Sequence, residues 1–172
     1  MHAPAELADK DSLFQDACNV TAHYKSVRAS APSAGGPSIA LLHGFGANLW
    51  SWELVQQQLA DAVAGNVTAH DTPGFGLTSR STKLAAYSLA TNGNLARDLQ
   101  AIERAKSSET GPRVLVGHSL GCAAIAESVA ADAEGVDAIV LVAPAIMANP
   151  FKHRAQLSSR SIRCAASLTQ VG

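Results

Sequence analysis

The stretch Gly117-His118-Ser119-Leu120-Gly121 decides the fold that this chain is expected to adopt. It fits the pattern G-x-S-x-G and joins an apolar run, Arg113–Val116, to an alanine-rich segment, Leu120–Ala131. A serine on such a sharp turn from strand to helix is held above the sheet, and the flanking glycines let the two backbones approach closely. The pattern therefore predicts that Ser119 is a nucleophile at a strained turn, with an ordinary structural turn as the alternative.

Apolar runs on both sides of this turn predict strands that alternate with helices. The expected strands are Val20–Val27, Ser38–Leu42, Val67–Ala69, Arg113–Val116 and Val136–Val142. Helical spacing of apolar residues predicts a helix over Ala47–Ala62 and a second that begins after an N-cap at Ser88, with Leu89, Leu95, Leu99 and Ile102 on one face. This alternation indicates an α/β fold with a mostly parallel, doubly wound sheet, in which ligands bind at the carboxyl ends of the strands.

A second glycine-flanked loop, His43-Gly44-Phe45-Gly46, follows an earlier predicted strand. Such a loop can present a backbone N–H to a developing oxyanion, paired with the N–H of the residue after the nucleophile. The expected oxyanion donors are therefore the N–H groups of Phe45 and Leu120, unless the loop is only a turn between strand and helix. His43 itself is interpreted as a residue that hydrogen-bonds the loop rather than as a general base.

Four motifs in this order resemble the α/β-hydrolase superfamily. They are His43-Gly44-Phe45-Gly46, Trp50-Ser51-Trp52, the stretch Asp71–Ser79 and the serine turn at 117–121, and the resemblance runs from about Val20 to Pro150. The first and third motifs are similar to those of epoxide hydrolases, dehalogenases and small lipases or esterases. The serine argues against the first two groups, which use aspartate as nucleophile.

The resemblance implies a serine hydrolase that cleaves an ester or related acyl bond of a small to medium apolar substrate without a cofactor. It also implies that Asp71 stabilises a loop. Two further hypotheses stay open. The same fold and triad support hydrolysis of carbon–carbon bonds or acyl transfer, and the chain could also be a non-catalytic fragment or a protein-interaction module.

The other two members of the catalytic triad are not expected in this chain. In the family the serine is followed by an acid and then by a histidine. After Ser119 the one histidine is His153, which lies where the family begins its lid. The later acids fall on the helix after the turn or just beyond it: Glu127, Asp132, Glu134 and Asp137. We therefore expect the N-terminal half of the fold only, truncated before the C-terminal strands, with weak or no activity.

The chain is expected to divide into three segments. Residues 1–19 are interpreted as a polar leader, residues 20–150 as the N-terminal part of the hydrolase core, and residues 151–172 as a basic tail or the start of a lid. The last segment contains no acid and four basic residues, Lys152, Arg154, Arg160 and Arg163. Because further strands are expected to be absent, Val136–Val142 is predicted to be an exposed sheet edge through which the chain self-associates.

Two groups of side chains at the predicted strand ends have alternative interpretations. Three histidines fall there, His43, His70 and His118, but none has the spacing of a second metal ligand, so no metal is expected. Three aromatic residues could line an acyl pocket, with core packing as the favoured alternative: Trp50, Trp52 and Phe75.

Composition argues against several classes of protein. The 172 residues have a net charge of −1, so the basic face that nucleic acid requires is not expected. No apolar run approaches the roughly 18 residues of a membrane helix, and the acidic N-terminus is unlike a signal or transit peptide. Cys18, Cys122 and Cys164 suggest no disulfide framework. We expect an intracellular location, cytoplasmic or organellar, plastids included.

Overall fold

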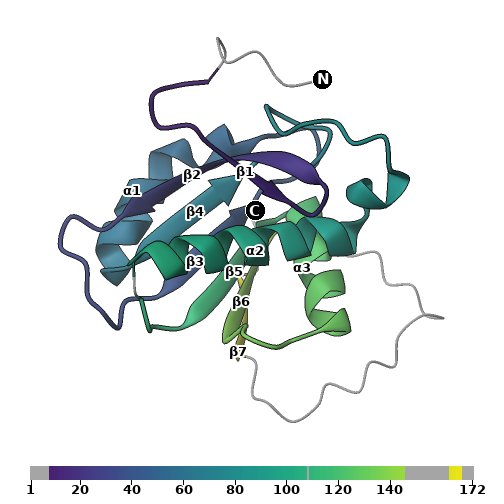
Figure 1. Cartoon of the computed structure of the whole chain (residues 1–172). Coiled ribbons are helices and arrows are strands. Elements are labelled where there is room, and N and C mark those ends of the chain that lie inside the picture. The colour runs from purple at the N-terminus through teal and green to yellow at the C-terminus, as the bar shows by residue number, and fades with distance from the viewer. Residues whose placement is uncertain (1–7, 108, 146–162, 168–172) are drawn as a thin grey trace, which may run out of the picture.

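A seven-stranded sheet runs through the part of the chain that the computed structural model describes, residues 8–107, 109–145 and 163–167 (Figure 1). Its strands, in the order β1-β2-β4-β3-β5-β6-β7, are β1 (Leu13–Ala17), β2 (Val20–Arg28), β3 (Ser38–Leu42), β4 (Asn66–His70), β5 (Arg113–His118), β6 (Ala138–Val142) and β7 (Arg163–Ser167). The strands from β4 to β7 are parallel, whereas β1 and β2 are antiparallel to their neighbours. The predicted α/β class and mostly parallel sheet are confirmed.

Within the described residues, three helices and two short 3₁₀ turns connect the strands. They are η2 (Leu49–Trp52), α1 (Glu53–Val63), η3 (Leu84–Tyr87), α2 (Leu89–Ser107) and α3 (Leu120–Ala131). The helix predicted over Ala47–Ala62 begins instead as η2, because the side chain of Asn48 caps that turn by accepting a hydrogen bond from the N–H of Trp50. The predicted cap of α2 is confirmed, since Ser88 Oγ accepts from the N–H of Thr91 at 3.1 Å.

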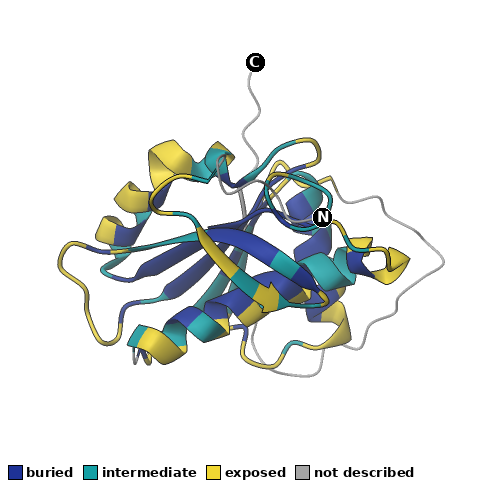
Figure 2. Cartoon of the chain, turned by 45° about the horizontal axis from the view of Figure 1, so that its top comes forward, coloured by how far each residue is buried: buried dark blue, intermediate teal, exposed yellow. Residues whose placement is uncertain are grey.

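The helices form a layer on each face of the sheet (Figure 1). Successive residues of a strand point to opposite faces, so Ile39 and Leu41 of β3 pack with the residues of α1 while Ala40 and Leu42 pack with α2 and α3. The strands β3 and β4 are accordingly buried from end to end, whereas β1 at the margin is largely exposed (Figure 2).

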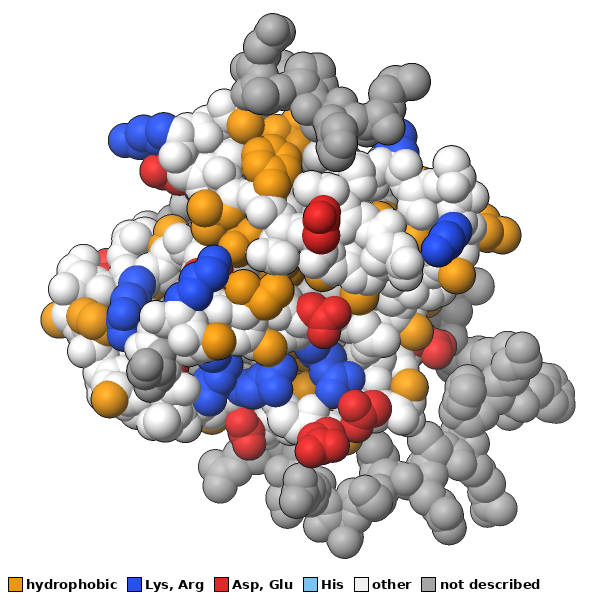
Figure 3. All heavy atoms as spheres, viewed as in Figure 1, with side chains coloured by type: hydrophobic (Ala, Val, Ile, Leu, Met, Phe, Trp, Pro, Cys, Tyr) orange, Lys and Arg blue, Asp and Glu red, His pale blue; other side chains and the backbone are white. Residues whose placement is uncertain are grey.

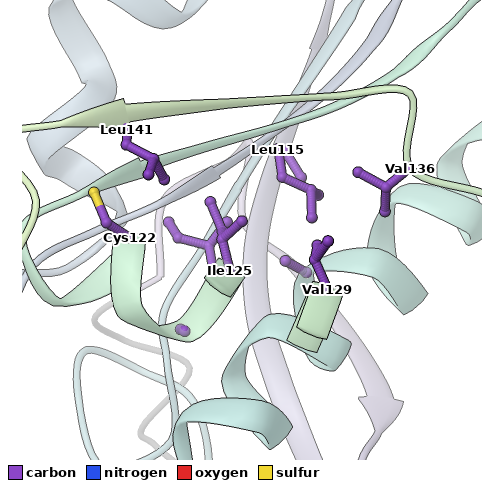
Figure 4. Packing of buried hydrophobic residues seen from close by; sticks show 10 residues of the cluster. Leu115, Cys122, Ile125, Val129, Val136 and Leu141 are labelled. Atoms are coloured by element: carbon purple, nitrogen blue, oxygen red, sulfur yellow. The ribbon is translucent and has the colours of Figure 1, made fainter. Parts of the chain in front are cut away.

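The core under α3 fixes the position of the helix that follows the serine turn. Cys122, Ile125 and Val129 of α3 pack against Leu115 and Leu141 of the sheet (Figure 4). Leu115 and Ile125 are fully buried. Because each buried leucine or isoleucine contributes a few kcal/mol, this contact anchors the start of α3 to the end of β5.

The parallel register brings the carboxyl ends of four strands to one edge of the sheet. Leu42 at the end of β3 is paired with His70 of β4 and with Gly117 of β5, and His118 is paired with Val142 of β6. The loops that follow these strands therefore emerge side by side. In sheets of this type, that edge is where ligands bind.

Two expectations from the sequence differ from the structure. The strand β6 is not an edge, because β7 pairs with it in parallel, so the predicted exposed edge at Val136–Val142 is wrong. Residues 13–17, within the stretch expected to be a polar leader, form β1. Cys18 and Asn19 both have positive φ, 49° and 62°, as a two-residue hairpin turn of type I′ requires. Apart from β7, the segment 151–172 lies outside the described residues.

Candidate functional site

Ser119 lies on a sharp turn between β5 and α3, as the sequence predicted. Its φ of 52° and ψ of −114° place a non-glycine residue in a backbone conformation that costs energy and is found most often at functional sites. A Cβ added to Gly117 would lie 2.7 Å from the backbone nitrogen of Cys122, and one added to Gly121 would lie 2.5 Å from the carbonyl oxygen of Leu42. Glycine is therefore needed on both sides of Ser119 for strand, helix and β3 to meet.

The end of β6 holds this turn in place. The N–H of Ser119 donates to the carbonyl oxygen of Val142 at 3.0 Å, and the carbonyl oxygen of Ser119 accepts from the N–H groups of Ala145 and Cys122, each at 3.1 Å. These bonds use the backbone of Ser119 but leave its side chain free for other contacts. The strained conformation is thus maintained by a neighbouring strand rather than by the turn alone.

The N–H groups of Leu120 and Phe45, which are expected from the sequence to be oxyanion donors, lie at the start of α3 and in the loop at 43–46. Leu120 is the first residue of α3, so its N–H has no partner within the helix, and the helix dipole favours negative charge at this end. The loop at 43–46 lies directly against the serine turn, since a Cβ on Gly44 would be 3.1 Å from Ser119 Cβ. Among the described residues, the N–H of Phe45, the next residue, donates to no hydrogen bond.

His43 fastens this loop rather than acting as a base, in agreement with its interpretation from the sequence. Its side chain is buried, Nδ1 lies 2.7 Å from the carbonyl oxygen of Gly44, and Nε2 accepts from the N–H of Thr72 at 3.1 Å. This pattern requires a proton on Nδ1 and none on Nε2. Burial lowers the pKa of His43, and the bond to Gly44 and the charge of Asp71 offset that effect only in part.

Asp71 joins the two loops that border the site, which confirms its expected loop-stabilising role. Its carboxylate accepts from the N–H of Leu49 at 2.8 Å, the N–H of Leu77 at 2.8 Å and His23 Nδ1 at 2.7 Å. Burial acts to raise the pKa of Asp71, but these three bonds outweigh it and the pKa lies below its usual value. A charged carboxylate therefore ties the segment after β3 to the segment after β4.

The aromatic residues divide between the site and the core. Phe75 packs edge-on against Phe45, with ring centroids 5.6 Å apart, and against His43 at 5.8 Å. Phe45 itself is 79% exposed, which is unusual for a large apolar side chain. Trp50 and Trp52 instead pack against the core on the α1 side. Phe75 thus lies against the loop at 43–46, whereas both tryptophans pack against the core and Trp50 also lines a groove.

His70 is buried at the end of β4 and forms no hydrogen bond with any described residue. Burial lowers its pKa to about 3, so the ring is neutral at ordinary pH. His43 and His118, weighed with it as metal ligands, lie at the ends of the neighbouring strands. The described residues contain no group of three or more histidine, cysteine, aspartate or glutamate side chains that could hold a metal ion.

The acids that follow Ser119 lie far from it. Asp137 accepts from the N–H of Arg113, at the opposite end of β5, and Asp132 pairs with Arg97 beyond the last turn of α3. His153 lies outside the described residues. No histidine or carboxylate among the described residues is hydrogen-bonded to Ser119. His23, the partner of Asp71, was not identified from the sequence, because a lone histidine on a strand has no local signature.

Comparison with known proteins agrees with this geometry. The model of the "Alpha/beta hydrolase family" matches residues 39–168. An uncharacterized protein of Mycobacterium tuberculosis is 34% identical over 114 residues, 62% of this chain and 30% of its own length. The dihydrolipoyllysine-residue acetyltransferase component of the acetoin cleaving system of Cupriavidus necator is 36% identical over 122 residues, 69% of this chain and 29% of that protein.

Among solved structures, a probable hydrolytic enzyme from Pseudomonas aeruginosa is similar, with 26% identity and a TM-score of 0.61 over 77% of this chain and 40% of that one. The chain thus spans less than half the length of these relatives. None of the helices in the described part of the chain is long and apolar enough to cross a membrane. Strand order, serine turn and family match agree, and the chain belongs to the α/β hydrolase family.

Proposed function

We propose that this chain carries the nucleophile and oxyanion donors of a serine hydrolase that acts on an ester or related acyl bond. The observation that supports this most strongly is the strained backbone of Ser119 at the start of α3, with the loop of Gly44 packed against it. A strained turn kept by two obligatory glycines is costly for folding alone. The cost of this strained turn is explained if the turn serves to hold the serine side chain above the sheet.

In the proposed reaction, Ser119 Oγ attacks the acyl carbon and the N–H groups of Phe45 and Leu120 stabilise the oxyanion. Donors fixed before the reaction supply much of the transition-state stabilisation in such sites. The serine hydroxyl must also lose its proton, and no described side chain is placed to accept it. We therefore expect binding and slow acylation, with little turnover.

The proposed substrate is small and apolar. The exposed ring of Phe45 and its partner Phe75 offer apolar surface next to Ser119. On the face that Figure 3 shows, basic side chains lie among acidic ones, which does not favour a nucleic-acid partner. Cys18 and Cys122 are free thiols, in keeping with a reducing intracellular compartment.

The test is chemical rescue of the missing base. The chain is treated with a fluorophosphonate, with and without added imidazole, and the labelled tryptic peptide 114–152 is quantified. We expect slow labelling at Ser119 that imidazole accelerates at least tenfold, and none in Ser119→Ala. Labelling at Ser119 that imidazole does not change, together with nitrophenyl ester turnover above about 1 s⁻¹, an ordinary rate for an enzyme, would show that a base is already present. Absence of any labelling would contradict the proposal.

Acyl transfer is a second candidate, favoured by the 36% identity to the acetyltransferase component of Cupriavidus necator. The same acyl-enzyme would pass its acyl group to a thiol or alcohol instead of water. Adding a thiol acceptor to the imidazole-rescued reaction distinguishes the two, because a transferase consumes the acceptor in preference to water.

A further inference from the structure

A second serine, remote in sequence from Ser119, has the hydrogen-bond partners of a catalytic triad. Ser12 Oγ lies 2.8 Å from His23 Nε2, and His23 Nδ1 lies 2.7 Å from Asp71 Oδ2. Serine to Nε2, and Nδ1 to aspartate, is the connectivity of the Ser-His-Asp triad. The three residues come from the turn before β1, from β2 and from the segment after β4. We propose that Ser12 is a second reactive serine, which His23 and Asp71 activate toward acyl and phosphonyl electrophiles.

The base of this group is firmly oriented. His23 and Asp71 are 0% and 1% exposed, and the Asp71 carboxylate is itself held by the N–H groups of Leu49 and Leu77. When the neutral ring carries its proton on Nδ1, which donates to the aspartate, the lone pair of Nε2 faces Ser12. Phe14 of β1 lies over the imidazole, with ring centroids 5.0 Å apart, and restricts its rotation. Such orientation of the imidazole is what the buried aspartate of a triad provides.

Ser12 is accessible from solvent, unlike its two partners. Its residue is of intermediate burial. Its neighbours Asp11 and Leu13 line a groove of about 550 Å³, whose other walls include Lys25, Leu49 and Trp50. Apolar side chains beside basic and acidic ones suit a small ester with an apolar body. The groove is thus lined by the residues on either side of Ser12.

Asp9 competes with His23 for the hydroxyl proton of Ser12. Asp9 Oδ1 lies 2.8 Å from Ser12 Oγ, the same separation as His23 Nε2, and a hydroxyl has one proton to donate. When the proton points to His23, the serine is arranged for attack. When it points to Asp9, the serine is inactive, so Asp9 sets how often the reactive arrangement occurs.

The proposed step is the transfer of an acyl or phosphonyl group to Ser12. The Ser12 oxygen forms a bond to the electrophilic carbon or phosphorus, its proton passes to His23 Nε2, and the alcohol or fluoride leaves, the alcohol taking the proton back. For a fluorophosphonate, the P–F bond breaks and the P–O bond forms. We expect one modification per chain and no rapid turnover.

The experiment uses the full chain with Ser119→Ala, so that the first serine cannot react. After fluorophosphonate treatment, labelling is measured on the tryptic peptide 11–25, in which Ser12 is the one serine. We expect labelling at Ser12 that added imidazole does not accelerate, because this serine has its own base. Added Asp9→Ala is expected to raise the rate severalfold, since it removes the competing acceptor.

The control for the base is His23→Asn, whose amide still donates to Asp71 but has no nitrogen at the position of Nε2. We expect it to slow labelling at least 100-fold, the usual scale of general base catalysis. A folded Ser119→Ala chain that is not labelled at Ser12 would overturn the proposal, as would labelling that His23→Asn leaves unchanged. If His23→Asn does not fold, the Asp9→Ala rate decides, and no increase there counts against the proposal. In the chain that keeps Ser119, labelling of peptide 114–152 tests the Ser119 proposal separately.

Discussion

Gly121, which follows Ser119 and Leu120, is a position of the site where backbone leaves no room for a side chain. A methyl group at Gly121 would lie 2.5 Å from the carbonyl oxygen of Leu42 and 2.9 Å from that of His43. Both contacts are with backbone atoms, so no side chain can rotate away. Gly121→Ala must therefore push the start of α3 away from the end of β3, which separates the serine turn from the loop at 43–46.

The expected cost follows from the geometry. Forcing an extra methyl group into a well-packed interior typically costs about 1–3 kcal/mol, and contacts with backbone at this distance favour the upper end of that range. We expect the urea midpoint of Gly121→Ala to fall by about 1–3 M, from roughly 3 kcal/mol divided by a slope of about 1–3 kcal/mol per M. Imidazole-rescued labelling of Ser119 should fall at least tenfold because the two oxyanion donors no longer converge.

Gly35→Ala is the matched control. A Cβ at Gly35 meets no atom within 4 Å, and the residue is exposed. This variant should leave Ser119 labelling unchanged and shift stability by no more than about 1 kcal/mol through the unfolded chain. Wild-type stability and labelling in Gly121→Ala would refute the conclusion that the close approach of α3 to β3 builds the site.

Three further predictions concern buried groups. Burial lowers the pKa of His70 from 6.5 to about 3, so the unfolded chain binds this proton more readily. The free energy of unfolding should therefore fall by about 1.4 kcal/mol per pH unit below pH 6.5. Denaturation at pH 6 and pH 5 should show a smaller fall for His70→Leu. Leu115→Ala should cost about 2–5 kcal/mol in urea unfolding, and a cost below 1 kcal/mol would contradict the packing in Figure 4. Asp71→Asn should cost about 1–3 kcal/mol, because buried N–H donors lose their charged acceptor, and should slow labelling of both serines; an effect on one serine alone would show that their sites are independent.

Local sequence signals account for most of the central fold. The strand Ser38–Leu42 and the helix Leu120–Ala131 have the bounds that the sequence predicts. Both are continuous apolar or alanine-rich runs that end at glycine or at a polar turn, so their limits are set by residues within the element itself. The serine turn is predictable for the same reason, because its glycines are required by contacts that any strand–turn–helix of this type makes.

The margins of the sheet depend instead on pairing with a neighbouring strand. The strand Arg163–Ser167 has little apolar character, and it is a strand because β6 offers an unpaired edge. Likewise, Leu13–Ala17 contains two exposed apolar residues and is ordered by pairing with β2 across the Cys18–Asn19 turn. Neither residue of that turn is a glycine, so the usual hairpin signal is missing.

Asp71 shows why the site itself could be predicted only in part. The sequence marks it as a turn residue after a strand, and Oδ2 fulfils that role by accepting from the N–H of Leu77, six residues further along. Oδ2 also accepts from His23, and Oδ1 accepts from the N–H of Leu49; both bonds reach other segments, which no local pattern near Asp71 specifies. A single carboxylate thus fixes the loops around Ser119 and the imidazole that faces Ser12. Because both arrangements require the same ionised group, a mutation that neutralises it cannot affect one serine without affecting the other.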